Sequence, residues 1–509
     1  MSNLKIGWSE ISITPDKKVS LVGQFAERIS QYVEKPLMAT AMAIECGDDC
    51  AILCSCDLVS VGWNLVLAVR QRLTQMGAEF DVNKIILSAI HTHTGPGHKP
   101  TRRVNIEHPD LGGKVGFDTL RTMLEGYLKP GQKYIEKENI SQNPEIATAA
   151  EVFDLLVDRL SAVIMTAWNN RKAGGFANAF GRVAVGMCRR AAYSDGSAQM
   201  WGDTNKAVFT QLEGGNDSGM ELMYVFDENK KLTGIVANLA CPAQCVQHRL
   251  FVSPDFWGEV KVRLRAHFGE EIFVLPQCSA AGDQCPVDLV RWVEPESDIN
   301  DPNCKRTNPP KRKADPSMFD LAGMYRVGRR IANEIIQVWE DGLDEMQQDV
   351  AFEHRVVDMP LPLRRATLTD VTNAKRAIRD YVQDKDGDID YNDVAHMQVY
   401  LGILQRFSMQ DDLDNITVEI HFIRLGTVAI ATNPFELFLD YGNQIKARSV
   451  CEQTFLIQLA NGADGYLPTA KAEAGGHYSA FLSSGQVGHV GGEMLVRQTL
   501  DQIRDLFEN

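Results

Sequence analysis

Residues 84–97 read KIILSAIHTHTGPG, and this stretch combines an apolar run with two closely spaced histidines. The run from Lys84 to Ile90 is nearly continuous and of strand length, which is typical of a strand buried on both faces of a sheet. His91 and His93 follow at once. Side chains two residues apart point the same way in extended backbone, so both imidazoles can face one ligand. Gly95, Pro96 and Gly97 then predict a sharp turn that leaves room for a substrate.

Neutral imidazole is a good zinc ligand, so this motif is a candidate metal site. The spacing alone leaves a second interpretation open, in which the two histidines only make hydrogen bonds within a loop.

Strands and helices alternate on both sides of this stretch, which predicts a mixed α/β fold with layered sheets. We expect strands over 39–46, 50–61, 176–185, 198–201, 221–226, 232–239, 271–278, 350–363, 416–431 and 454–460, and helices over 64–76, 146–170, 260–268, 320–339 and 493–507. The chain is interpreted as one large domain over 1–509. We expect an insertion near 98–142, an exposed loop over 294–316 and a helical segment near 366–412.

Composition restricts the class of protein. The 509 residues are 44% hydrophobic and 23% charged, as in a soluble globular protein, and the formal net charge is -15. This charge argues against a nucleic-acid partner, which would need a basic face. No apolar run is long enough for a membrane span and no signal peptide is recognisable, so we expect a cytoplasmic protein without stable membrane association. The odd number of 11 cysteines then predicts reduced thiols. Whether copies of the chain form a homo-oligomer stays open.

Three further segments carry candidate site residues. CPAQCVQH at 241–248 offers Cys241, Cys245 and His248, although its spacing matches no common structural zinc site. CSAAGDQCP at 278–286 contains small residues that let the backbone approach a ligand, and Cys285 as a candidate nucleophile. Near the C-terminus, Glu436 follows an expected strand, Tyr466 lies in ANGADGYLPT and Tyr478 lies in GGHY.

Four segments together resemble the neutral/alkaline ceramidase family. They are KIGWSEISITP at 5–15, LSAIHTHTGPG at 87–97, NPFELF at 433–438 and ANGADGYLPT at 460–469. The most specific is HTHTGPG, which is HTHSGPG in the family. The resemblance runs thinly from about residue 5 to 480 and implies a zinc-dependent amidase with a mixed α/β catalytic domain.

The resemblance also implies roles for individual residues. Carried over position by position, His91, Glu436 and Tyr466 are zinc ligands. His93 lies beside the metal and interacts with substrate, while Tyr478 and Arg189 lie near the reacting amide.

This sequence departs from the family pattern at two positions. The family's second histidine ligand falls on Cys241, which leaves open whether Cys241 or His248 completes the metal site, or whether the metal is weak or absent. A family serine falls on Cys285 of the segment GDQCP, which also contains Asp283. We recognise neither the signal peptide nor the C-terminal β-sandwich domain of secreted ceramidases, so we expect a small, soluble substrate rather than a membrane lipid.

The resemblance therefore implies a Zn²⁺-dependent hydrolase of an amide (N-acyl) or related acyl bond. His93, Arg189, Cys285 and Tyr478 are its catalytic candidates; His91, Cys241, Glu436 and Tyr466 are the metal candidates; Gly95, His248 and Asp283 are assigned to substrate binding. Two alternatives remain open. One is a metal-free enzyme or binding protein on the same scaffold that uses Cys285, and the other is a hydrolase of non-acyl substrates such as sugar derivatives.

Overall fold

A computed structural model describes residues 4–24, 27–99, 117–135, 143–291, 318–342 and 346–508. Its largest element is an eight-stranded sheet that is antiparallel in the middle and has a parallel pair at each edge, β14–β16 and β6–β7. In spatial order the strands are β16 (Phe273–Cys278), β14 (Leu232–Leu239), β13 (Gly219–Asp227), β8 (Lys172–Arg182), β1 (Leu4–Ser12), β5 (Met38–Cys46), β6 (Asp49–Cys56) and β7 (Ile85–Ala89).

A second, four-stranded sheet consists of β18 (Phe352–Pro362), β19 (Asn415–Leu425), β20 (Val428–Thr432) and β22 (Gln453–Ile457). The β20–β22 pair is parallel. Shorter pairings lie around the sheets: β2 (Ser20–Leu21) with β3 (Arg28–Ile29), β4 (Tyr32–Val33) with β15 (Phe251–Val252), β9 (Met187–Cys188) with β17 (Gln284–Cys285), β10 (Arg190–Tyr193) with β11 (Ala198–Met200) and β12 (Phe209–Leu212), and β21 (Glu436–Leu437) with β23 (Tyr466–Leu467).

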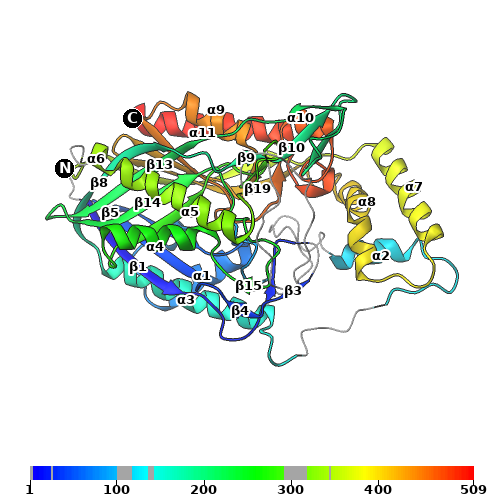
Figure 1. The fold of residues 1–509 in the computed structure, drawn as a ribbon, viewed down its shortest axis with the longest axis horizontal. Coiled ribbons are helices and arrows are strands. Elements are labelled where there is room, and N and C mark those ends of the chain that lie inside the picture. Colours follow the sequence, from blue (N-terminus) through cyan, green and yellow to red (C-terminus); the bar gives the residue numbers. More distant parts are fainter. Residues whose placement is uncertain are drawn as a thin grey trace.

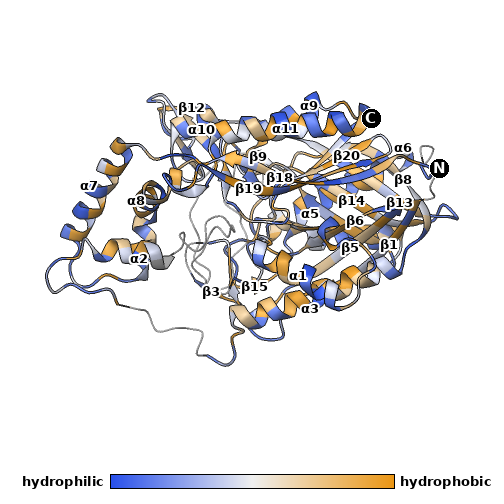
Figure 2. Ribbon diagram, turned by 180° about the vertical axis from the view of Figure 1, so that it is seen from behind, coloured by the Kyte–Doolittle hydropathy of each residue, from blue (hydrophilic) through white to orange (hydrophobic). Residues whose placement is uncertain are grey.

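The two sheets pack face to face between outer layers of helices (Figure 1). One apolar cluster joins their inner faces, with residues such as Ile44 and Met223 from the large sheet and Phe455 from the small one. Helices α1 (Trp63–Gln75), α3 (Ala149–Asn169), α4 (Phe256–Phe268) and α5 (Asp320–Gln337) cover the other face of the large sheet. The small sheet is covered by α9 (Leu439–Arg448) and α11 (His489–Glu508). Figure 2 shows these layers from behind, with many hydrophobic residues in the strands between them.

Three helices form a separate apolar cluster beside the layers. They are α2 (Phe117–Glu125), α7 (Leu368–Asp384) and α8 (Tyr391–Met409), and they lie at one end of the molecule in Figure 1. Thr367 and Asp370 form a capping box that begins α7. The helical segment expected near 366–412 is therefore a pair of helices. Of the expected insertion at 98–142, residues 98, 99 and 117–135 are described, whereas the loop expected at 294–316 lies outside the described residues.

The mixed α/β class with layered sheets is confirmed, but several element boundaries are wrong. The strand expected over 416–431 is two strands, because Gly426 takes a left-handed turn with a φ of 60° between β19 and β20. Strand-forming residues continue on both sides of Gly426, so local composition does not separate the two strands. Helix α4 begins before 260, because the carboxylate of Asp255 accepts the backbone N–H of Phe256.

The cysteines in the described ranges are free thiols, as expected. Among the helices of the described ranges, none has the length and apolar character that crossing a bilayer would require.

Asn461 joins the edge of the large sheet to the chain that follows β22. Its side-chain Oδ1 accepts the backbone N–H of Leu87 at 2.8 Å, and its Nδ2 donates to the carbonyl of Ile85 at 2.9 Å. Its own backbone N–H donates to the carbonyl of Leu87 at 2.9 Å. Asn461 is buried and has a φ of 51°, a conformation that asparagine tolerates better than most residues. These bonds bring the carboxyl ends of β7 and β22 together.

We predict that Asn461→Ala lowers the free energy of unfolding by about 2 to 4 kcal/mol, because it leaves one buried N–H and one buried carbonyl without their partners. Urea unfolding measures this change. Asn373→Ala, on the exposed face of α7, is the control and should stay within about 0.5 kcal/mol of the unchanged protein. A loss below about 1 kcal/mol for Asn461→Ala would show that this link is dispensable.

Candidate active site

Chemically active residues follow the parallel strands of both sheets at their carboxyl ends, where ligands bind in many α/β folds. His91 follows β7, Cys241 follows β14 and Asp283 follows β16. Glu436 follows β20 and Tyr466 follows β22. The packing of the two sheets therefore brings segments far apart in the sequence to one place.

The hydrogen bond of His91 determines its tautomer. Its Nδ1 lies 2.8 Å from the carbonyl oxygen of Val59, which can only accept, so Nδ1 carries the proton. The Nε2 lone pair is then directed toward Glu436, whose Oε2 is 3.4 Å away. Burial lowers the pKa of His91 and keeps the ring neutral. His91 is thus prepared to accept a hydrogen bond or to bind a cation.

The proton position of His93 follows from Gln244. The Nη1 of Arg189 donates to the Oε1 of Gln244 at 3.1 Å, and a guanidinium has no acceptor, which fixes the orientation of the amide. The amide NH₂ therefore donates to the Nε2 of His93, at 3.0 Å. Burial lowers the pKa of His93 well below its usual value, so this ring is also neutral.

The Nε2 of His91 and the carboxylate of Glu436 are consequently two acceptors without a proton between them. The Nε2 atoms of His91 and His93 are 3.3 Å apart, and the carboxylate of Glu436 lies beside the first. Facing lone pairs repel one another unless a cation or a donor lies between them. Gln244 lies inside the candidate segment CPAQCVQH, but the spacing of its cysteines and histidine does not indicate a role for an amide.

Glu436 and Tyr466 are neighbours in a short parallel pairing. They are register partners in β21 and β23, so their side chains emerge on the same side. The Nη2 of Arg189 donates to the Tyr466 hydroxyl at 3.4 Å. The rings of Tyr466 and Tyr478 meet edge to face with centroids 5.4 Å apart. Burial raises the pKa of Tyr478 to about 12 and raises that of Tyr466 as well, so both phenols are neutral.

Two glycines permit close backbone approaches at this site. A Cβ on Gly282 would lie 2.3 Å from the carbonyl oxygen of Glu436, and the Gly282 carbonyl accepts the Nη2 of Arg189 at 2.9 Å. A Cβ on Gly23 would lie 2.3 Å from the ring of His93, and Gly23 has a φ of 96°. The Gly23 backbone thus packs directly on the imidazole. Nothing in the local sequence around Gly23 indicates this contact.

The two departures from the family pattern are buried thiols that contact carbonyl oxygens. The Sγ of Cys241 is 3.5 Å from the carbonyl of Val185, and that of Cys285 is 3.3 Å from the carbonyl of Val287. Burial raises the pKa of Cys285 to about 12 and raises that of Cys241 well above the usual range. Both are therefore neutral thiols, whereas a nucleophile or a zinc ligand must be a thiolate.

The residues assigned to substrate binding have other contacts. His248 stacks on Phe319 at 4.7 Å and lies 3.6 Å from Asp320. The Oδ1 of Asp283 accepts the backbone N–H of Leu439 at 2.9 Å and so caps the start of α9. Gly95 has no side chain that could contact a substrate, and its carbonyl accepts the N–H of Val22 at 3.2 Å. None of these contacts includes His91 or Glu436.

In the described ranges, no three His, Cys, Asp or Glu side chains form a group that could hold a metal ion. The convergence of His91, His93 and Glu436 is therefore not a complete metal site by these residue types, and Tyr466 is the remaining donor beside it.

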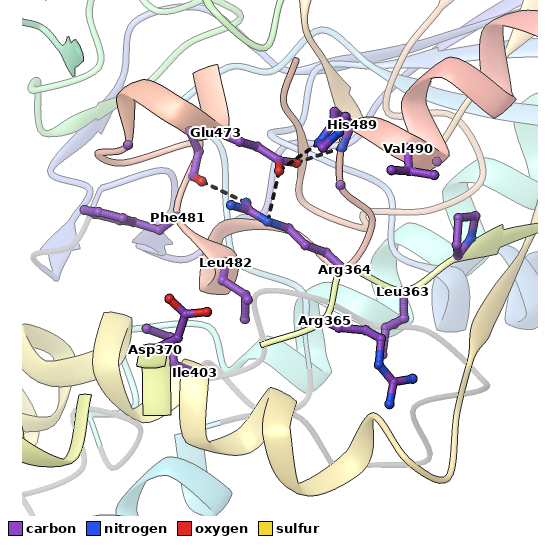
Figure 3. A pocket seen from close by; sticks show the side chains of 15 residues that line it. Leu363, Arg364, Arg365, Asp370, Ile403, Glu473, Phe481, Leu482, His489 and Val490 are labelled. Carbon is purple, nitrogen blue, oxygen red and sulfur yellow. Dashed lines mark hydrogen bonds and ion pairs between the residues drawn. The ribbon is translucent and has the colours of Figure 1, made fainter. Parts of the chain in front are cut away.

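A cavity of about 510 Å³ lies beside the segment that carries Tyr478 (Figure 3). Its polar lining includes Arg364, Glu473 and His489, and Glu473 contacts the Nε of Arg364 at 3.4 Å and the Nδ1 of His489 at 3.0 Å. The same cavity borders Gly476 and residues 480–482. None of the candidate catalytic or metal residues is among the residues that line it.

Comparison with solved structures finds two ceramidases whose fold is similar to that of this chain. No family model and no curated relative matches the sequence. Among solved structures, the neutral ceramidase from Pseudomonas aeruginosa aligns with 100% of this chain and 75% of its own, with a TM-score of 0.65 and 14% identity. A ceramidase complexed with C2 aligns with 100% of this chain and 76% of its own, with a TM-score of 0.64 and 14% identity.

The chain has the neutral ceramidase fold. The resemblance inferred from four short segments is therefore confirmed for the fold. At this identity the likeness concerns the fold alone, and the zinc ligands and catalytic roles carried over from ceramidases stay predictions.

We predict that Gly23→Ala destabilises the protein by about 1 to 3 kcal/mol more than Gly77→Ala, because the new methyl group overlaps the His93 ring. Gly77 is a matched control: its φ is 76°, so alanine meets similar backbone strain there, but within the described part of the chain no neighbouring atom lies within 4 Å of the added Cβ. Chemical denaturation of both variants gives the difference. Equal losses would show that Gly23 is needed only for its backbone conformation.

A second prediction concerns Asp283. Burial raises its pKa to about 6, above the unfolded value of about 3.9. Between these values the folded state binds more protons than the unfolded state, so stability falls as pH rises from about 4 to 6. Across this window the free energy of unfolding of the unchanged protein should fall by about 1 to 3 kcal/mol relative to that of Asp283→Asn. The comparison cancels the other buried carboxyl groups, and parallel stability curves would contradict the prediction.

Proposed function

We propose that the protein is a Zn²⁺-dependent hydrolase that cleaves an amide (N-acyl) or related acyl bond of a small, soluble substrate. The observation that carries the proposal is the approach of the unprotonated Nε2 of His91 to the Glu436 carboxylate, 3.4 Å away, with Tyr466 paired beside Glu436. Such a set of acceptors attracts a cation. The neutral ceramidase fold supports the same chemistry by analogy.

His91, Glu436 and Tyr466 would hold the zinc ion. The imidazole is neutral and its Nδ1 is fixed by a backbone carbonyl, as is usual for histidines that bind metals. Glu436 and Tyr466 are side by side in β21 and β23. When bound, zinc lowers the pKa of a water molecule and polarises a carbonyl group.

The fourth ligand of the proposed zinc ion would be either Cys241 or a water molecule. For Cys241 to bind, its thiol must leave the Val185 carbonyl and lose its proton, and burial without a metal opposes that loss. His248 fits this position less well, because it stacks on Phe319 beside Asp320.

The remaining candidates would act on the substrate directly. The Nε–H of Arg189 is buried and has no hydrogen-bond partner among the described residues, so it can donate to an oxygen that gains negative charge during the reaction. The Tyr478 hydroxyl is a second donor, on a ring that packs edge to face against Tyr466. Its pKa of about 12 keeps it protonated at neutral pH. His93 would orient the reacting group.

The alternative in which Cys285 is the nucleophile has less support. Its thiol is fully buried, and Arg189 offsets only part of the effect of burial on its pKa. A thiolate would therefore be rare at neutral pH.

We predict that the purified protein contains about one zinc per chain. His91→Ala and Glu436→Ala should lower the zinc content at least about tenfold, because each removes a direct ligand. His98→Ala is the control: it removes a buried histidine of the same segment and should leave zinc in place. Elemental analysis measures the content. Less than about a tenth of an equivalent in the unchanged protein, with activity insensitive to chelators, would overturn the zinc assignment.

Replacement of zinc by Co²⁺ tests the fourth ligand. Binding of Cys241 would give a sulfur-to-cobalt charge-transfer absorption that Cys241→Ala abolishes. We expect this band to be absent, because the thiol is already hydrogen-bonded to Val185.

A substrate screen tests the reaction class. N-acyl amides, esters and glycosides should be offered to the metal-loaded protein and to Glu436→Ala. Turnover of amides or esters that depends on Glu436 supports the proposal. Turnover restricted to glycosides would favour the hydrolysis of sugar derivatives instead.

A further inference from the structure

The segment that carries Tyr478 has an unfavourable backbone conformation. His477 and Ser479 have φ values of 70° and 73°, in the left-handed region that side chains disfavour. On one side the flanking residues border the cavity of Figure 3. The segment therefore needs contacts from elsewhere to keep one conformation.

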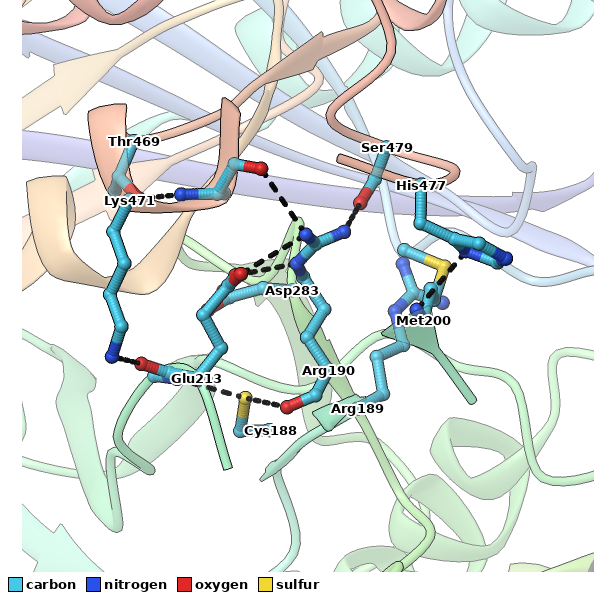
Figure 4. Close-up of polar contacts among 12 residues, drawn as sticks. Cys188, Arg189, Arg190, Met200, Glu213, Asp283, Thr469, Lys471, His477 and Ser479 are labelled. Carbon is cyan, nitrogen blue, oxygen red and sulfur yellow. Dashed lines mark hydrogen bonds and ion pairs between the residues drawn. The ribbon is translucent and has the colours of Figure 1, made fainter. Parts of the chain in front are cut away.

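Arg190 provides these contacts (Figure 4). Its Nη1 donates to the carbonyl of Tyr478 at 3.0 Å and to the hydroxyl of Ser479 at 3.2 Å. Its Nη2 donates to the carbonyls of Gly476 at 2.7 Å and Ala472 at 3.4 Å. One rigid guanidinium thus holds the chain before and after Tyr478.

Glu213 fixes the orientation of Arg190. Its carboxylate accepts the Nε of Arg190 at 2.5 Å and the Nη2 at 3.1 Å, and Arg190 is fully buried. The Glu213 backbone is held by its own N–H, which donates to the Arg190 carbonyl at 2.8 Å, and by Lys471, which donates to its carbonyl. Buried ion pairs add little net stability, because both charges lose their hydration. What this pair provides is a defined geometry.

Arg189 and Arg190 act on the two phenols from adjacent positions. Arg189 donates to the hydroxyl of Tyr466, while Arg190 donates to the backbone of Tyr478. The two rings meet at an interplanar angle of 76°. This dipeptide therefore contacts both tyrosines, one at its hydroxyl and the other at its backbone.

We propose that Arg190, held by Glu213, is a positioning residue for Tyr478. It does not contact the reacting groups; it keeps the Tyr478 hydroxyl at the distance from Tyr466 and Arg189 that the reaction needs. The inference rests on the proposed hydrolase function, but the hold on the segment can be tested without any activity.

The first test is amide hydrogen exchange across residues 476–482. The N–H groups of Gly476, Ala480 and Phe481 form hydrogen bonds within this part of the chain. Arg190→Met and Glu213→Gln should speed their exchange at least about tenfold. The matched control is Glu10→Gln, which neutralises a similarly buried carboxylate bound to Lys261 and Arg265. Unchanged protection in Arg190→Met, or an equal change in the control, would overturn the proposal.

The second test is a double-mutant cycle with Tyr478→Phe. Arg190→Met should lower kcat about 10- to 100-fold with little change in KM, because it misplaces a group used in the transition state. Arg190→Lys should recover part of this loss. In the Tyr478→Phe background, Arg190→Met should cost no further activity.

The two tests separate the possible failures. If Arg190→Met lowers kcat equally with and without the Tyr478 hydroxyl, Arg190 acts by another route and the proposal is wrong. If the unchanged, zinc-loaded protein hydrolyses no amide or ester, the proposed function fails, and the exchange experiment alone decides whether Arg190 holds the Tyr478 segment.

Discussion

Hydrogen bonds between the two sheets, at the carboxyl ends of their parallel strands, are the constraint on which the candidate site depends. Asn461 bonds to β7, the side chain of Asn238 donates to the carbonyl of Leu456 at 2.8 Å, and the N–H of Gln458 donates to the carbonyl of Cys278 at 3.0 Å. Apolar packing between sheets is non-directional and would tolerate small sliding movements. These polar bonds have fixed partners, so they set the register in which His91 meets Glu436.

A second polar group connects the same two sheets beside Asn461. His354 and His421 are 2.9 Å apart, and His421 lies 3.0 Å from Glu419, which accepts two hydrogen bonds from Arg70 of α1. Asn461 also reaches this group, since its Nδ2 is 2.9 Å from His421. Buried polar groups are costly unless all their partners are present. The network thus favours a single alignment of the sheets, and through Asn461 it is connected to the strand that precedes the site.

The sequence predicted the elements better than their contacts. The strand before His91 and the helical hairpin after residue 366 follow from local hydrophobic patterns, and the short motifs identified the ceramidase fold. The partners of His93 did not follow from any pattern. Gln244 and Gly23 are distant from His93 in the sequence. The fold brings the side-chain amide of Gln244 to its Nε2 and the backbone of Gly23 against its ring. Arg190 and Glu213 were missed for the same reason, since no local spacing marks a buried ion pair.

The formal charges of the site determine what the proposed zinc ion would require of its neighbours. The two imidazoles are neutral, so Arg189 and Glu436 supply the formal charges of the site, and they oppose one another. A divalent cation would add positive charge next to the buried Arg189 guanidinium, which Glu436 alone cannot balance. Coordination by Tyr466 would require loss of the phenol proton, and Arg189 already donates to that oxygen at 3.4 Å. Arg189 would then balance the charge of the phenolate as well as that of the substrate oxygen, and through Gln244 it would connect metal binding to the proton position of His93.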